Sequence, residues 1–219
     1  MRYTKLLFDL DGTISDPKEG ICKSFQHALR HFGINVENLD DLEMVIGPPL
    51  RDSFQEFYGM SAEDAELGTT IYRERFGKVG LFENEIYPGM KPMLEKLVDN
   101  GATLAIASSK PMEYIHEILK YFEIEQCFTY VVGAYMDGTR GTKDEIVKDA
   151  IEMLGGEVEK DHMLMIGDRK FDMFGAHENG IRAVGCAFGY GGRKELEEEN
   201  AEYVVDSVEE LEALLLELL

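Results

Sequence analysis

The sequence predicts an α/β protein in which a parallel sheet is covered by helices on both faces, with an all-helical insertion near the start. Three observations support this class. An apolar run opens the chain at residues 3–8, helical patterns without a convincing strand fill residues 16–83, and strands alternate with helices from residue 87 onward. Such alternation is typical of parallel sheets, because each parallel connection needs a crossover, usually a helix.

The composition narrows the class of protein further. The 219 residues are 44% hydrophobic, which suffices for a sizeable core in one domain with an insertion or in two small domains. The formal net charge of −21 argues against nucleic acid and anionic membranes as partners. The three scattered cysteines predict neither a disulfide framework nor a zinc site. Without a long apolar segment or a leader peptide pattern, we expect a cytoplasmic protein.

The first predicted strand, residues 3–8, leads into Asp9-Leu10-Asp11-Gly12-Thr13. Residues two apart on an extended segment point to the same side, so Asp9 and Asp11 are expected to face each other. At ~4 Å and an effective dielectric of ~20, two carboxylates repel by roughly 4 kcal/mol. A fold that keeps both ionised therefore needs a cation between them, and a hard divalent ion is the obvious candidate.

The insertion that follows is predicted to be helical throughout. Apolar residues recur at helical spacing from Lys18 to Phe32, with Gly33 as a stop, and Leu50–Tyr58 and Ala62–Val79 show the same amphipathic pattern. Turn residues such as Gly47-Pro48-Pro49 separate these helices. The domain division predicted from these patterns is residues 1–15 with 84–219, and residues 16–83.

The rest of the chain alternates between helix and strand. The predicted elements are helix 90–100, strand 103–107, helix 112–122, strand 130–133, helix 143–154, strand 163–166, helix 171–179, strand 183–187, helix 193–199, strand 203–205 and a closing helix from residue 208. Ligands of such folds bind beyond the carboxyl ends of the strands.

Polar residues gather at those strand ends. Ser108 follows one strand, and Asp168 follows another, with Asp172 one helical turn further on. Together with Asp9 and Asp11 they can converge on one rim of the sheet. Ser108 could instead cap the next helix, and Lys143 could be a solvated residue at a helix start, although a lysine there opposes the helix dipole.

These residues resemble the motifs of the haloacid dehalogenase superfamily, in its phosphatase branch. Asp9–Thr13 matches the DxDGT motif, and the motifs that begin at Ser108, Lys143 and Gly167-Asp168 follow in the family's order. The resemblance spans nearly the whole chain. It implies a Rossmann-like catalytic core and a small helical cap at residues 16–83, and it is closest to phosphoglycolate phosphatases and their 5'-nucleotidase-like relatives.

The resemblance also implies roles for individual residues. Asp9 would be the nucleophile and Asp11 the general acid and base, with Ser108 and Lys143 completing the catalytic set. The phosphoryl group would be held by Ser108, Lys143 and the backbone amides of Leu10 and Ser109. Mg²⁺ would be bound by the carboxylates of Asp9 and Asp168 and by the backbone carbonyl of Asp11. Asp172 would bind the ion through a water molecule or would orient the residues that bind it directly.

Substrate choice is expected to depend on the cap and on the rim of the core. Pro48 and Arg51 belong to a segment that resembles the family's cap loop, and Arg51 could meet a carboxylate or a second phosphate. A Gly-Pro turn ending in a solvated arginine is the alternative. Arg169 stands beside the metal aspartate, where relatives often have small or polar residues, and could contact an anion.

Three functions remain open at this point. The favoured one is a Mg²⁺-dependent phosphomonoesterase that acts on a small phosphorylated metabolite through an aspartyl-phosphate and resembles phosphoglycolate phosphatases, with a 5'-nucleotidase that acts on nucleoside monophosphates as its alternative. A phosphomutase of the β-phosphoglucomutase kind shares the core and the cap. A non-enzymatic receiver-like module would use a phosphorylatable aspartate for signalling. Either a monomer or a homodimer is compatible with the sequence, since the apolar face of the last helix could cover the sheet or support dimerisation.

Overall fold

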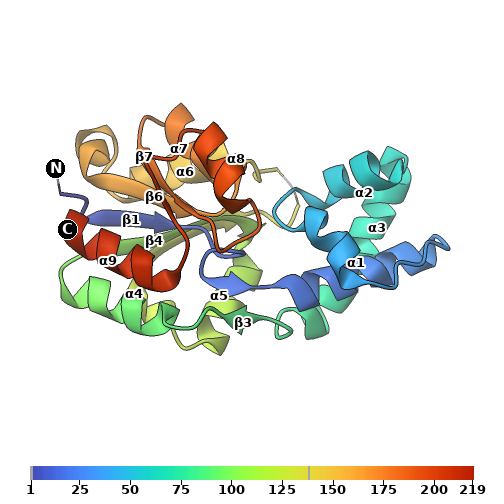
Figure 1. The fold of residues 1–219 in the computed structure, drawn as a ribbon. Helices are drawn as coiled ribbons and strands as arrows, with labels where there is room; N and C mark the ends of the chain where they lie inside the picture. Colours follow the sequence, from blue (N-terminus) through green and yellow to red (C-terminus); the bar gives the residue numbers. More distant parts are fainter. Residues whose placement is uncertain (1, 138) are drawn as a thin grey trace. The chain divides into compact units, whose positions relative to one another are not determined.

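The computed structural model describes residues 2–137 and 139–219. They divide into two compact units, coloured along the chain in Figure 1. The sheet unit comprises Met1–Ser15 and Ile86–Leu219, and the helical unit comprises Asp16–Glu85. The segments that join them pair as two-residue strands, β2 (Ser15–Asp16) and β3 (Glu85–Ile86).

In the described part of the sheet unit, six parallel strands are arranged in the order β5-β4-β1-β6-β7-β8. Their bounds are β1 Lys5–Phe8, β4 Thr103–Pro111, β5 Phe128–Ala134, β6 Met163–Gly167, β7 Arg182–Cys186 and β8 Tyr203–Val205. The apolar run at the start of the chain thus lies at the centre of the sheet. Its two neighbours, β4 and β6, are the strands that precede the other predicted motifs.

Helices cover both faces of this sheet, with α6, α7 and α8 on one face and α4, α5 and α9 on the other (Figure 1). Their bounds are α4 Met90–Asp99, α5 Met112–Tyr121, α6 Lys143–Met153, α7 Lys170–Glu178, α8 Gly192–Glu198 and α9 Val208–Leu218. Alternate residues of each strand pack on opposite faces, so Leu7, Ala105 and Met165 join the core beneath α6 and α7. The predicted fold class is confirmed.

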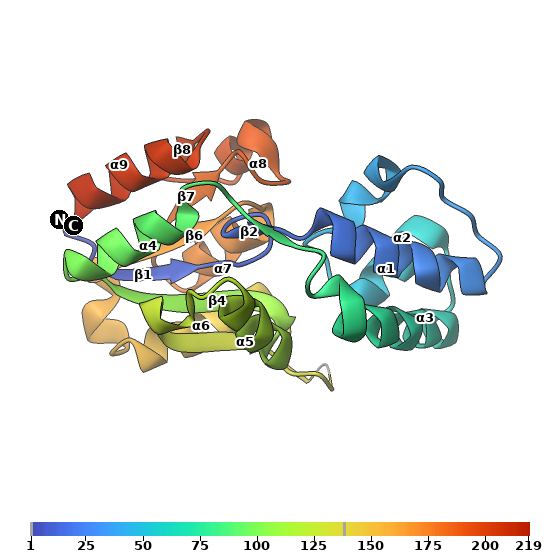
Figure 2. The same cartoon turned by 90° about the horizontal axis from the view of Figure 1, so that it is seen from below.

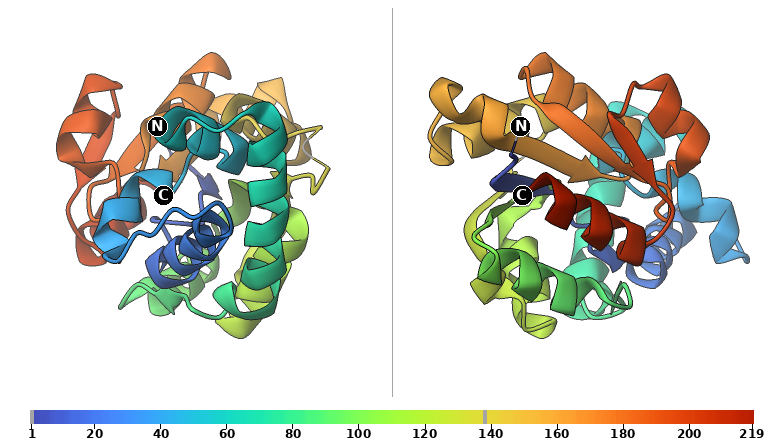
Figure 3. Two further views of the ribbon diagram at one scale, coloured as in Figure 1. Left: turned by 90° about the vertical axis from the view of Figure 1, so that its right-hand side faces the viewer. Right: turned by 60° about the vertical axis from the view of Figure 1, so that its left-hand side comes forward.

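The last helix, α9, packs beside α4 (Figure 3, right), where Lys96 Nζ lies 2.5 Å from Glu212 Oε1. Figure 2 shows the two ends of the described chain close together, and the Tyr3 N–H donates to the Leu218 carbonyl oxygen at 2.9 Å. Of the two expectations for the apolar face of this helix, the structure shows it covering the sheet, with Leu211 and Leu215 fully buried.

The helical unit is built on α1 (Lys18–His31), α2 (Leu50–Tyr58) and α3 (Ala62–Arg75). Its core is aromatic, with the ring of Phe25 stacked on that of Phe54 at a centroid separation of 4.1 Å. Tyr72 meets Phe25 edge-on at 6.5 Å. These contacts explain why short helices hold together here, since stacked and edge-on ring pairs add to the free energy of burial.

Several local features differ from the prediction. The helix expected over 62–79 ends at Arg75 and continues as a wider π turn, Phe76–Gly80, and Leu39–Val45 forms an unpredicted 3₁₀ helix. Strand β4 continues to Pro111 instead of ending at Ala107. Ser108 and Lys110 therefore lie within a strand, where the register with β5 shifts, and both are buried.

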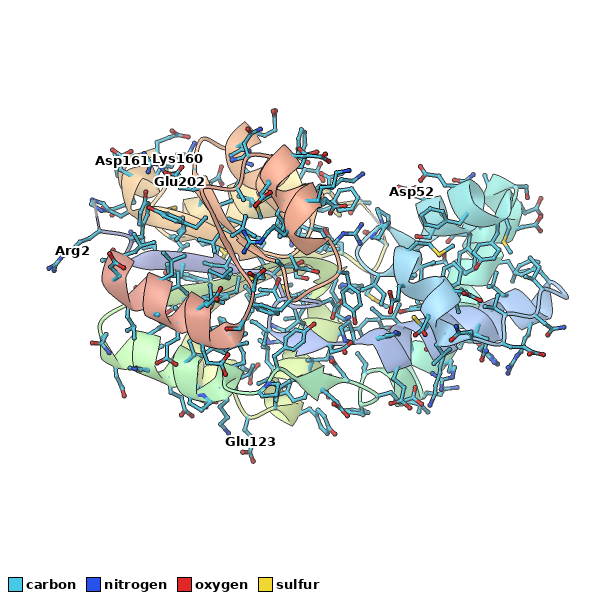
Figure 4. The ribbon with its side chains drawn as sticks, in the orientation of Figure 1. Arg2, Asp52, Glu123, Lys160, Asp161 and Glu202 are labelled. Carbon is cyan, nitrogen blue, oxygen red and sulfur yellow. The ribbon has the colours of Figure 1, made fainter. Side chains whose placement is uncertain are left out.

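The charged residues lie mainly on the outside. Figure 4 shows the side chains of Arg2, Glu123 and Asp161 directed away from the ribbon, and all three residues are exposed. Among the helices that the structure describes, none has both the length and the apolar character required to cross a bilayer.

Candidate active site

The candidate site lies at the carboxyl ends of the three central strands. Phe8 of β1 is in register with Ile106 of β4 and with Ile166 of β6. The residue that follows Phe8 is Asp9, and Asp168 follows the end of β6. Parallel pairing thus brings residues that are about 160 positions apart in the sequence to one edge of the sheet.

Asp9, Asp168 and Asp172 form a buried cluster at this edge. Each offers a carboxylate oxygen, and these atoms all lie within 4.8 Å of one another. Asp168 is oriented by the Tyr190 backbone N–H, which donates to Oδ2 at 2.8 Å, and by the hydroxyl of Thr13, which donates to Oδ1 at 3.3 Å. The Arg169 N–H donates to Asp172 Oδ2 at 3.0 Å, which fixes Asp172 in the first turn of α7.

Lys143 supplies a positive charge to this cluster. Its Nζ lies 3.0 Å from Asp9 Oδ1 and 2.7 Å from Asp172 Oδ1, and it donates to the carbonyl oxygen of Ala107 at 3.1 Å. Only 5% of the side chain is exposed, so it is not a solvated residue at a helix start. Although burial alone would lower the pKa of Lys143, Asp172 and Asp9 raise it above its usual range, and the ammonium stays charged.

Negative charge still exceeds positive charge among these groups. Burial, followed by repulsion from Asp172 and Asp9, raises the pKa of Asp168 well above its usual range. Burial also raises the pKa of Asp172 to about 6, even though Lys143 opposes the shift. The single ammonium of Lys143 contacts two of these three carboxylates, and carboxylate oxygens are the donors that hard divalent cations prefer. The residues present therefore fit a divalent metal ion.

Two glycines allow the surrounding chain to approach Asp168 closely. Gly12 has φ +81°, and a Cβ there would lie 2.2 Å from Asp168 Oδ2. A Cβ on Gly189 would lie 2.4 Å from the Asp168 Cβ and 2.4 Å from the Gly12 carbonyl oxygen. The stretch Gly189-Tyr190-Gly191-Gly192 therefore packs against a candidate metal ligand.

The Gly189→Ala variant is expected to lose about 1–3 kcal/mol of unfolding free energy, because the added methyl group overpacks the site. The affinity for a divalent cation should fall by about tenfold, since Asp168 would be displaced. Urea unfolding and titration calorimetry measure the two effects. Gly141→Ala is the matched control, since among the described residues its Cβ would meet only Ala134 Cβ, at 3.9 Å. Equal losses in both variants would contradict the expectation.

Asp11 lies beside the cluster and contacts Lys110 of β4. Lys110 Nζ forms an ion pair and a hydrogen bond with Asp11 Oδ2. The exposed fractions of the two side chains are 5% and 15%. Burial raises the pKa of Asp11, whereas Lys110 opposes the shift. The Lys110 backbone N–H is 3.4 Å from Ser108 Oγ, so the predicted serine lies in the same segment.

Ser108 does not serve as a helix cap. Helix α5 begins at Met112 after Pro111, without a side-chain cap. Ser108 is buried, and the preceding residue, Ala107, accepts the hydrogen bond from Lys143. Leu10 and Ser109 adjoin Asp9 and Ser108 in the chain. Their binding of phosphate through backbone amides stays a prediction.

The predicted substrate residues are divided between the two units. Pro48 and Arg51 belong to the helical unit, where Arg51 pairs with Glu66. Arg169 belongs to the sheet unit, and its Nε donates to Glu195 Oε1 at 3.0 Å. Contacts of these three residues with a substrate stay predictions.

The sequence analysis gave no role to Lys110 or to the Tyr190 amide. Lys110 follows the motif serine by two positions, and it lies in the part of β4 beyond Ala107 that was not predicted to be a strand. The role of the Tyr190 amide could not be predicted from the sequence. A backbone N–H is present in almost every residue, and only the folded loop brings this one to Asp168.

Comparison with known proteins agrees with this geometry. Residues 6–186 match the family model described as haloacid dehalogenase-like hydrolase. A 5'-nucleotidase of Pseudomonas aeruginosa is 42% identical over 196 residues, which cover 90% of this chain and 88% of that protein. A phosphoglycolate phosphatase of Vibrio parahaemolyticus is 28% identical, with 94% and 93% covered.

A solved structure is also closely similar. The crystal structure of a predicted phosphatase from Clostridium acetobutylicum superimposes with a TM-score of 0.95 at 40% identity, covering 99% of this chain and 100% of that one. The family resemblance seen in the motifs is therefore confirmed over most of the chain. With its buried aspartate cluster at the end of the central strand, the chain belongs to the haloacid dehalogenase-like hydrolases, as a phosphatase of that family.

Proposed function

We propose that the protein is a Mg²⁺-dependent phosphomonoester hydrolase that works through an aspartyl-phosphate on Asp9. The observation that carries this proposal is the contact of Asp9 with Lys143 inside the cluster formed with Asp168 and Asp172. A buried carboxylate held beside an ammonium and two further carboxylates suits a nucleophile that must face an anionic phosphate.

The residues divide the reaction into two steps. In the first, an Asp9 oxygen forms a bond to phosphorus, the bond to the leaving oxygen breaks, and Asp11 gives that oxygen a proton. In the second, Asp11 takes a proton from water as the water oxygen attacks phosphorus, which releases phosphate and restores Asp9. Lys143 and Ser108 hold the phosphoryl oxygens and balance their charge during both transfers.

The metal site of this proposal consists of Asp9, Asp168, Asp172 and the Asp11 carbonyl oxygen. Bound Mg²⁺ would supply electrostatic stabilisation to a phosphoryl group that otherwise meets several carboxylates. The carboxylate donors of the cluster suit this hard ion.

The substrate is proposed to be a small phosphorylated metabolite. Nucleoside monophosphates are the first class to test, because the relative named 5'-nucleotidase is 42% identical, whereas the one named phosphoglycolate phosphatase is 28% identical. Pro48, Arg51 and Arg169 are proposed to select among leaving groups, with each arginine able to bind an anionic group.

The test is phosphate release from nucleoside monophosphates, phosphoglycolate, sugar phosphates and an aryl phosphate, with Mg²⁺ or with EDTA. We expect release that requires Mg²⁺, and acid quenching during turnover should trap phosphate covalently on the protein. Release at equal rates in EDTA would contradict the metal dependence. A requirement for a bisphosphate would indicate a mutase, and phosphorylation without turnover would indicate a receiver-like module.

A further inference from the structure

We propose that Lys110 is a positioning residue, which holds one oxygen of Asp11 so that the other is presented to the reacting group. This inference rests on the proposed function, because it assigns Asp11 the work of general acid and base. It adds a residue that the family motifs quoted above do not include.

The first support is the placement of Lys110. Its ammonium is withdrawn from water, with 5% of the side chain exposed, and it contacts Asp11 Oδ2. Withdrawing an ammonium from water costs several kcal/mol, which an ion pair recovers only with good geometry. The burial of Lys110 in β4, next to β1, therefore indicates a role other than packing.

The second support is the other oxygen of Asp11. Within residues 2–137 and 139–219, Asp11 Oδ1 is buried and accepts no hydrogen bond. A buried acceptor without a partner costs about 1–3 kcal/mol, and such atoms are rare in folded proteins. Lys110 thus occupies one oxygen of the carboxylate, whereas the other is an acceptor without a partner among these residues.

The third support is the connection to the phosphoryl site. Ser108 and Lys110 are two positions apart on β4 in a stretch where the register with β5 shifts, both are buried, and the Lys110 backbone nitrogen lies 3.4 Å from Ser108 Oγ. The segment that carries the phosphate-binding serine thereby also sets the direction of the acid and base. A displacement of about 1 Å in such a group can cost ~10²-fold in rate.

The experiment compares kcat/KM for an alkyl phosphate and for p-nitrophenyl phosphate in the wild type and in Lys110→Met. An alkoxide needs protonation to leave, whereas nitrophenolate does not. Because kcat/KM covers only the steps through phosphoryl transfer, the later hydrolysis does not enter. We expect a loss of about 10²-fold for the alkyl phosphate, in the range of general acid catalysis, and little change for the aryl phosphate.

Three further variants sharpen the comparison. Lys96→Met is the matched control, because Lys96 is 52% exposed and pairs with Glu212 on the surface. If the Lys110→Met variant fails to fold, Lys110→Gln replaces it in the comparison of the two phosphates. Glutamine can still donate a hydrogen bond. In an Asp11→Asn background, Lys110→Met should cost no further activity, because Lys110 acts through Asp11.

Equal losses for both phosphates would overturn the proposal and make Lys110 a structural or phosphate-binding residue. A further large loss in the Asp11→Asn background would also overturn it, since Lys110 would then act independently. If the wild type releases phosphate from neither substrate, the proposed function itself fails, and this outcome differs from the other two.

Discussion

The Asp9→Asn variant is expected to lose about 10⁴-fold or more in kcat/KM, because an amide oxygen is a far weaker nucleophile than a carboxylate. Asp9 is buried at 9% exposure, and Lys143 contacts its Oδ1. Water therefore has little access to the position from which the Asp9 carboxylate would attack phosphorus. The initial rate of phosphate release from an aryl phosphate with saturating Mg²⁺ measures the loss. Because the aryl group leaves without a proton and kcat/KM covers only the steps through phosphoryl transfer, the kcat/KM for this substrate isolates the nucleophile from Asp11.

Asp161→Asn is the matched control for this experiment. Asp161 is exposed and precedes β6, whereas the site lies beyond the other end of that strand. Its rate should equal that of the wild type. An Asp9→Asn rate within tenfold of the wild type, in a variant that unfolds cooperatively, would show that Asp9 is not the nucleophile.

The metal-free protein is expected to lose about 3 kcal/mol of unfolding free energy between about pH 4 and pH 7 through Asp172 alone. Burial raises the pKa of Asp172 from 3.8 to about 6. Between these values the folded protein holds a proton that the unfolded chain has released, so the free energy of unfolding falls as the pH rises. The stability is fully present below about 3.8 and is lost as the pH passes through about 6. Asp168, whose pKa is also raised, acts in the same direction.

Urea unfolding in EDTA over this pH range measures the effect. The Asp172→Asn variant resembles the neutral carboxyl group and can still accept the Arg169 N–H, so its stability should depend less on pH by about 3 kcal/mol. Mg²⁺ should restore much of the wild-type stability at pH 7 because it binds the ionised cluster. Equal pH dependence in the two proteins would contradict the assignment of the shift to Asp172.

Local patterns were sufficient to predict the architecture. The periodicity of residues 50–58 predicted α2 with its observed bounds, and the alternation after residue 87 predicted the order of strands and helices. The short spacing within Asp9-Leu10-Asp11 and the order of the motifs identified the family. These signals are local or ordered along the chain, so one sequence contains them.

Features that depend on three-dimensional neighbours were not predicted. The contact between Lys110 and Asp11 requires β4 beside β1, and it requires β4 to continue past Ala107. The stacking of Phe25 on Phe54 likewise depends on how helices pack, since apolar periodicity does not choose partners. Gly189 reads as a turn residue until its approach to Asp168 is known.

The position of β1 at the centre of the sheet has a consequence for how the protein folds. Lys5 is in register with Thr103 on one side and with Met163 on the other, so β1 can pair on both sides only with strands that are distant in the sequence. Contacts of such long sequence separation form slowly, and an unpaired apolar strand is prone to aggregate meanwhile. During refolding, the ability to bind metal should therefore appear only when β6 has joined β1, after the helices have formed.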